Sequence, residues 1–131
     1  MKITPDTNLI VRIFTEDDRK QAERAEAELE KADLIALPLP TLCEVVWVLS
    51  RGYGASSAGI AKAIRAFIND TKVTLDRTAA DAGLAMLDAG GDFADGVIAH
   101  QGAWLGADCF LSFDKKAVKL LEEQGKHARL L

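Results

Sequence analysis

Short apolar runs alternate with longer segments of helical periodicity along the whole chain. Runs such as 34–37 (LIAL) and 109–113 (CFLSF) have the length and apolar character of buried strands. Strands are expected at 2–6, 34–37, 72–75, 109–113 and 128–131. Helices are expected at 7–14, 18–32, 41–54, 56–70, 77–91, 92–107 and 114–125. This alternation predicts an α/β fold.

Strands that are separated by helices favour a parallel sheet, because parallel neighbours need long crossover connections. The expected fold is a three-layer α/β/α sandwich with a central, mostly parallel sheet. No linker or repeat interrupts the 131 residues, and this length suits one hydrophobic core. We therefore expect a single domain over residues 1–131. In such sheets, ligands bind beyond the carboxyl ends of the strands.

The composition excludes several classes of protein. With 16 basic and 20 acidic residues the net charge is −4, unlike that of a protein that coats nucleic acid. No apolar run approaches the roughly 20 residues of a membrane span, and the N-terminus lacks the apolar segment of a secretory signal. Cys43 and Cys109 stand among apolar neighbours and are expected to be buried. His100 and His127 come without a CxxC, so a zinc site is not expected. These features predict a cytoplasmic protein without a membrane partner.

Glu44 is the one charged residue in the apolar run 34–50. Its helix is apolar on nearly every side, which predicts a central position with Glu44 in the interior. Moving a carboxylate into an apolar interior costs several kcal/mol. Three explanations remain open: a raised pKa, pairing with an arginine such as Arg12 or Arg51, or a bound divalent cation.

Four further acids lie near expected strand ends: Asp6, Asp92, Asp95 and Asp114. Asp6, Asp92 and Asp114 could each cap a helix, and Asp92 with Asp95 resembles a capping box. Glu44 lacks such an explanation, and this favours a cation that gathers all the acids. Oxygen ligands without histidine or cysteine select Mg²⁺ or Mn²⁺. The usual task of these ions in a carboxylate cluster is phosphoryl chemistry.

Four blocks of the chain resemble those of PIN-domain ribonucleases, in particular the VapC-like toxins of type II toxin–antitoxin systems. The blocks are DTNLIVRIF (6–14), PTLCEVVWVLSRGYG (40–54), DFADGVIAHQGAWLGA (92–107) and SFDKKA (112–117). The resemblance implies a catalytic, metal-binding quartet of Asp6, Glu44, Asp95 and Asp114. It implies a supporting role for Asp92, Asn8, Thr7 and Ser112.

The resemblance also implies an activity and partners. The expected activity is an endoribonuclease that uses Mg²⁺ or Mn²⁺ to hydrolyse RNA phosphodiesters to 5′-phosphate and 3′-hydroxyl ends. The expected assembly is a homodimer that a cognate antitoxin protein silences. Leu42, Trp47 and Trp104 could line a core or an interface, and the core is favoured for all three.

Three positions depart from the common pattern of the family. Pro5 precedes the first acid and cannot donate to a sheet, so the first strand is expected to stop pairing there. Gly96 stands where alanine is common and adds a helix cost of up to about 1 kcal/mol beside Asp95. Ser112 replaces a frequent threonine and keeps the hydroxyl.

Two other functions compete with the nuclease. A phospho-acceptor signalling domain is also α/β and also binds Mg²⁺, but it needs adjacent acids after the first strand, and PDTN (5–8) supplies one. It also leaves Glu44 unexplained. In a metal-free α/β interaction module, every acid would be a helix cap, and removal of Asp6 would change stability alone.

Overall fold

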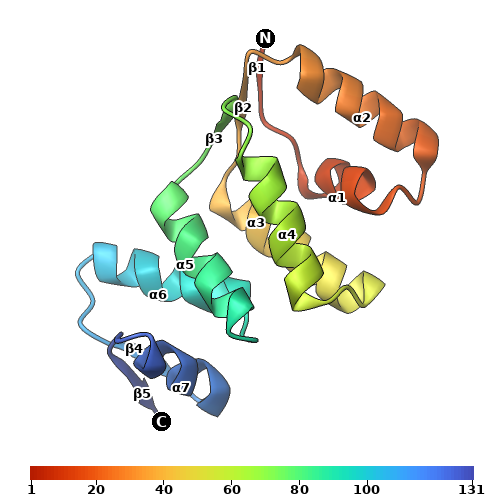
Figure 1. The fold of residues 1–131 in the computed structure, drawn as a ribbon. Coiled ribbons are helices and arrows are strands. Elements are labelled where there is room, and N and C mark those ends of the chain that lie inside the picture. Colours follow the sequence, from red (N-terminus) through yellow and green to blue (C-terminus); the bar gives the residue numbers. More distant parts are fainter. The chain divides into compact units, whose positions relative to one another are not determined.

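The chain forms two compact units, Met1–Asp76 and Arg77–Leu131, in a computed structural model that describes residues 1–131 (Figure 1). Each unit combines helices with a parallel sheet. The predicted α/β class with parallel strands is therefore confirmed. The single-domain organisation remains a prediction.

The first unit contains a three-stranded parallel sheet in the order β1-β2-β3. Its strands are β1 (Lys2–Ile3), β2 (Leu34–Ala36) and β3 (Val73–Thr74). Between β1 and β2 the chain forms α1 (Thr7–Thr15) and α2 (Arg19–Lys31). Between β2 and β3 it forms α3 (Leu39–Trp47), the π-helical turn η1 (Val48–Gly52) and α4 (Ser57–Ile68). Each crossover is helical, as parallel pairing requires.

Two prolines of this unit lie at element boundaries. The first strand ends at Ile3, before the buried Pro5, so the expectation that pairing stops there is confirmed. The expected start of the next long helix at Thr41 is wrong, because α3 begins at Leu39 and includes Pro40. Proline fits the first turn of a helix, where its missing N–H would have no partner.

Aliphatic side chains of α3 and α4 form much of the core of the first unit. Leu42 and Val45 of α3 and Ile64 of α4 are fully buried, and the prediction for Leu42 is confirmed. Trp47 is 63% exposed, so its predicted core position is wrong. It lies on the solvent side of α3, and the helix is therefore not buried on every side.

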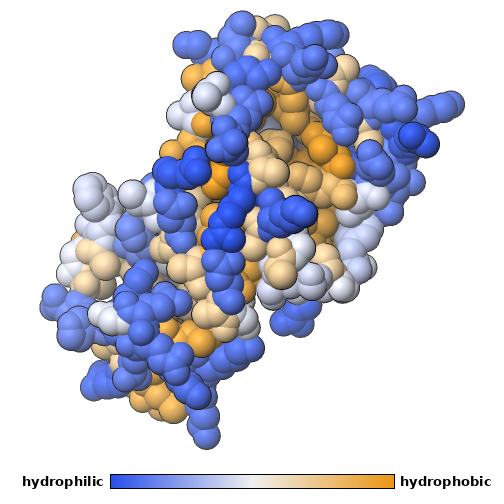
Figure 2. Space-filling view, viewed as in Figure 1, coloured by the Kyte–Doolittle hydropathy of each residue, from blue (hydrophilic) through white to orange (hydrophobic).

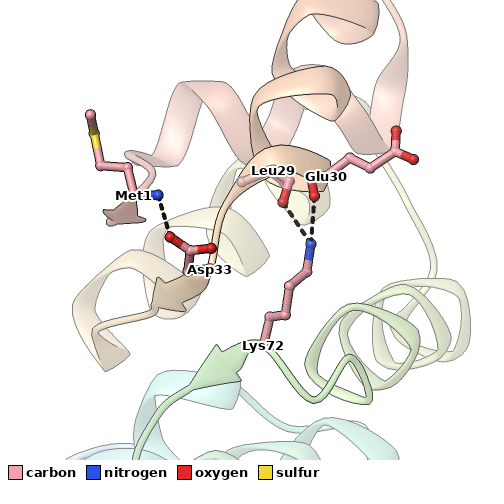
Figure 3. Close-up of polar contacts among 5 residues, drawn as sticks. All are labelled: Met1, Leu29, Glu30, Asp33 and Lys72. Carbon is pink, nitrogen blue, oxygen red and sulfur yellow. Dashed lines mark hydrogen bonds and ion pairs between the residues drawn. The ribbon is translucent and has the colours of Figure 1, made fainter.

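Two charged groups connect the end of α2 to the sheet (Figure 3). The Lys72 ammonium donates hydrogen bonds to the carbonyl oxygens of Leu29 and Glu30, at 2.9 and 3.0 Å. A positive charge at the C-terminal end of a helix also interacts favourably with the helix dipole. The Met1 ammonium contacts the Asp33 carboxylate at 2.5 Å, and this contact lowers the pKa of Asp33. These contacts join the starts of β1 and β3 to the segment that enters β2.

The second unit contains the helices α5 (Arg77–Asp88), α6 (Phe93–Trp104) and α7 (Lys115–Glu123). Its parallel sheet consists of β4 (Phe110–Ser112) and β5 (Ala128–Leu130). None of the helices in either unit has both the length and the apolar character needed to cross a bilayer.

Helices α5 and α6 pack closely because two glycines lie at their contact. A Cβ atom at Gly96 would collide with the Ala82 carbonyl oxygen and lie 2.8 Å from Met86 Cγ. A Cβ atom at Gly83 would lie 2.6 Å from the ring of Phe93. Gly96 is therefore needed for packing, and α6 continues through it without interruption.

The last residue of α6, Trp104, and the segment that joins α6 to β4 lie at the surface of the second unit. Trp104 is 86% exposed and Cys109 is exposed, so the predictions that these two side chains are buried are wrong. Cys43, in the first unit, is half-buried. Apolar neighbours in sequence do not bury a residue that lies in a surface connection.

Replacement of Gly96 by alanine should destabilise the protein by about 2 kcal/mol or more, because the added methyl group meets backbone atoms that cannot move aside. Gly102→Ala on the same helix is the matched control, since a Cβ atom there meets nothing within 4 Å. The control should be neutral or stabilising by up to about 1 kcal/mol, as helix propensity predicts. Urea unfolding followed by circular dichroism measures both values. Equal effects of the two substitutions would contradict the packing role.

Candidate active site

Asp6 begins α1 and caps it. Its Oδ1 accepts a hydrogen bond of 2.9 Å from the Leu9 amide, with the backbone of Asp6 extended, as is usual for an N-cap. The side chain is exposed, and no hydrogen bond occupies Oδ2. Asp6 is thus a helix cap that keeps one carboxylate oxygen available.

Glu44 is joined to the start of α1 through Thr7. The Thr7 hydroxyl donates a hydrogen bond of 2.8 Å to Glu44 Oε2. Because Thr7 directly follows Asp6, the bond brings a carboxylate from α3 to the N-terminal end of α1. The structure therefore brings together three predicted residues of the first unit: Asp6, Thr7 and Glu44.

The predicted burial of Glu44 is wrong, because its side chain is exposed. Within α3, Leu42, Val45 and Val46 form the buried face, and Glu44 lies on the solvent face with Trp47. Helical geometry separates sequence neighbours by about 100° around the axis, so apolar neighbours do not enclose a residue. No desolvation penalty remains to be explained at Glu44.

Pairing of Glu44 with Arg12, one alternative considered from the sequence, is also wrong. The Arg12 Nε donates to Gln21 Oε1 at 2.8 Å, and the partner of Glu44 is Thr7. What distinguishes Glu44 is therefore its position beside Asp6 and Thr7.

Two acids of the second unit cap helices. Asp92 caps α6 by accepting from the Ala94 amide at 3.0 Å. Asp114 caps α7 by accepting from the amides of Lys116 and Ala117 at 3.0 and 3.1 Å. In both residues the cap uses Oδ1, so Oδ2 remains without a hydrogen-bond partner. The capping roles expected from sequence are confirmed, and each carboxylate still has an oxygen to offer.

Asp95 lies in the first turn of α6 and is half-buried. Its pKa is raised, first by burial and then by the negative charges of Asp92 and Asp114. The three carboxylates are thus close enough to repel one another. A cation bound there would relieve this repulsion and favour the ionised form of Asp95.

The remaining supporting residues differ in what they do. Ser112 Oγ accepts a hydrogen bond of 2.9 Å from the Asp114 amide and so holds the residue that carries the carboxylate. Asn8 lies on α1, where its side chain lines a cavity with Arg12 and Arg24 and makes no hydrogen bond to a carboxylate. Sequence reasoning identifies Arg12 only as a possible partner of Glu44. It does not predict this cavity, because the lining residues come from two helices.

Each unit offers carboxylates with an oxygen that no hydrogen bond occupies. No group of three or more histidine, cysteine, aspartate or glutamate side chains is arranged to hold a metal ion. Mg²⁺ usually keeps several waters and binds through one or two carboxylates together with substrate phosphates. Carboxylates that each present one unengaged oxygen suit this mode of binding.

Replacement of Asp95 by asparagine should change the pH dependence of stability. A raised pKa in the folded state means that the ionisation of Asp95 removes stability as pH rises from about 4 upward. The free energy of unfolding of Asp95→Asn relative to the parent should therefore increase between pH 4 and 7. The change should be below about 1 kcal/mol, because the group is partly solvated. Urea unfolding in EDTA at several pH values measures it.

Asp108→Asn, at an exposed aspartate of the same unit, is the control. The difference in free energy of unfolding between this variant and the parent should stay constant from pH 4 to 7. A constant difference for Asp95→Asn as well would contradict the repulsion among Asp92, Asp95 and Asp114.

The chain is similar to a family of known proteins. The model of the PIN domain family matches residues 3–122. This range contains the five candidate acids Asp6, Glu44, Asp92, Asp95 and Asp114. No curated protein matches the chain. PIN domains are generally nucleases and typically use divalent metal ions. From the extent of this match, the chain belongs to the PIN domain family.

Proposed function

We propose that this protein is a Mg²⁺- or Mn²⁺-dependent endoribonuclease whose metal ligands are Asp6, Glu44, Asp95 and Asp114. The observation that carries the proposal is the family match, because residues 3–122 contain all four carboxylates. The raised pKa of Asp95 supports it, since mutual repulsion of carboxylates marks a region of negative potential that attracts cations.

When bound, a divalent cation would polarise the scissile phosphate and generate hydroxide from water near neutral pH. The four carboxylates, Asp6, Glu44, Asp95 and Asp114, would hold this cation. Thr7 fixes the Glu44 carboxylate by its hydrogen bond, and Ser112 fixes the backbone at Asp114. Because the caps hold Asp6 and Asp114 by one oxygen each, helix formation sets the direction of the other oxygen. The expected products carry 5′-phosphate and 3′-hydroxyl ends.

We further propose that the protein is the cytoplasmic toxin of a toxin–antitoxin pair, a homodimer that a cognate antitoxin protein inhibits. The resemblance to VapC-like toxins supports this setting. Exposed apolar side chains, among them Trp104 and Leu105 at 86% and 85%, supply surface that a protein partner could cover.

Asp6→Asn and Glu44→Gln should each lower the rate of RNA cleavage in Mg²⁺ by at least about 100-fold, because each removes an anionic ligand. Both should keep the fold, since both side chains are exposed. Each should also lose the increase in melting temperature that Mg²⁺ gives the parent. Glu26→Gln, an exposed glutamate on α2, is the control and should behave as the parent does. Normal cleavage by Glu44→Gln would refute its assignment as a ligand.

The same variants separate the competing functions. Incorporation of an acyl phosphate without RNA cleavage would favour the phospho-acceptor domain. A parent that neither binds Mg²⁺ nor cleaves RNA would favour the interaction module. For the toxin, induced expression of the parent should arrest bacterial growth, and Glu44→Gln should relieve the arrest.

A further inference from the structure

A cavity of about 520 Å³ lies between two helices of the first unit. Helices α1 and α2, which form its walls, pack side by side (Figure 1). The main lining residues are Asn8, Leu9, Arg12, Gln21, Arg24 and Glu28. The cavity begins at Asn8, two residues after the Asp6 cap, and extends along α1 away from it.

Two arginines supply donors to this cavity. Arg12 is half-buried and is fixed through its Nε, which donates to Gln21 Oε1 at 2.8 Å. The terminal nitrogens of its guanidinium make no hydrogen bond within the protein. Arg24 is exposed and forms no hydrogen bond or ion pair at all. Both guanidinium groups therefore keep donors for a ligand.

Glu28 is the one acid in the lining, and it does not neutralise Arg24. It lies four residues after Arg24 on α2, a spacing that permits an ion pair. Its carboxylate instead contacts the Lys31 ammonium at 3.7 Å. The surface over α2 is strongly hydrophilic (Figure 2). The cavity thus holds two positive charges against one negative charge that already has a partner.

We propose that this cavity binds a phosphodiester group of single-stranded RNA, close to the phosphodiester that is cleaved; the substrate class rests on the proposed function. A guanidinium group presents paired donors that match two phosphate oxygens. Asp6 and Arg12 lie on one helix, about 9 Å apart along its axis at 1.5 Å per residue. The start of α1, where Asp6 lies, and the cavity are therefore less than two helical turns apart.

The net charge of the protein makes such a subsite useful. At −4 the protein repels RNA overall, so binding requires local positive charge beside the acids. Asn8 stands between Asp6 and Arg12 in the sequence of α1 and lines the cavity, and its amide can donate to a phosphate or to a ribose hydroxyl. An acidic peptide would also suit the arginines, but nothing requires it to lie beside Asp6, as an RNA substrate must.

The test measures binding of a labelled single-stranded RNA by fluorescence anisotropy, in EDTA and at several salt concentrations. Arg24→Gln should weaken binding roughly 3- to 10-fold at low salt. It should also reduce the slope of log K against log salt by about 0.7, the value for one lost phosphate contact on a single strand. Arg12→Lys should weaken binding with little change in slope, because it keeps the charge and loses the paired donors.

Arg19→Gln is the matched control, because Arg19 is an exposed arginine of α2 that pairs with Glu23 and does not line the cavity. In cleavage assays, Arg24→Gln should raise KM and leave kcat nearly unchanged. The inference is overturned if Arg24→Gln and Arg12→Lys bind RNA as Arg19→Gln does. It is also overturned if the parent does not bind the RNA. A third contrary result is that the two arginine substitutions weaken binding of polyglutamate, used as an acidic peptide, and leave RNA binding unchanged.

Failure of the proposed function gives a different result. A parent that binds RNA with an Arg24-dependent salt slope, yet cleaves nothing in Mg²⁺ or Mn²⁺, would refute the nuclease and support the RNA-binding cavity. Cleavage that is insensitive to both arginines would support the nuclease and refute the cavity.

Discussion

The hydrogen bond from a carboxylate to the first amides of a helix determines how this protein presents its acids. Asp6, Asp92 and Asp114 each begin a helix and each use one oxygen as a cap. A cap fixes the carboxylate on a rigid element, beside the positive end of a helix dipole that stabilises its charge. Capping and metal binding are therefore compatible roles. The unengaged oxygen of each capping acid has a direction that folding sets before any ligand arrives.

The surroundings of Asp95 depend on a second constraint, the close contact of α5 with α6. Gly96 permits this contact because a side chain there would meet the backbone at Ala82. The adjacent Asp95 is half-buried as a result of its place in the first turn of α6, and its pKa is raised by burial and by its acidic neighbours. An energetically unfavourable cluster of charges is thus supported by a well-packed pair of helices, as is common at functional sites.

Charge is distributed along α1 in a way that connects chemistry to substrate binding. The helix carries an acid at its cap and an arginine in its second half, with Asn8 between them. For the RNA substrate proposed above, Arg12 places a positive charge on the helix that begins at Asp6, within a protein of net charge −4.

The sequence by itself determined the α/β class, the alternation of elements and the family. It also determined the capping roles of Asp6, Asp92 and Asp114. These features could be predicted because periodicity, cap preferences and motif spacing are local properties of the chain. It failed at Glu44, Trp47, Trp104 and Cys109, whose apolar neighbours suggested burial. Only the tertiary structure decided which face of α3 meets solvent, that Gly96 serves the contact of two helices, and that Arg12 and Arg24 share a cavity. These features depend on the packing of segments distant in sequence, which no local pattern encodes.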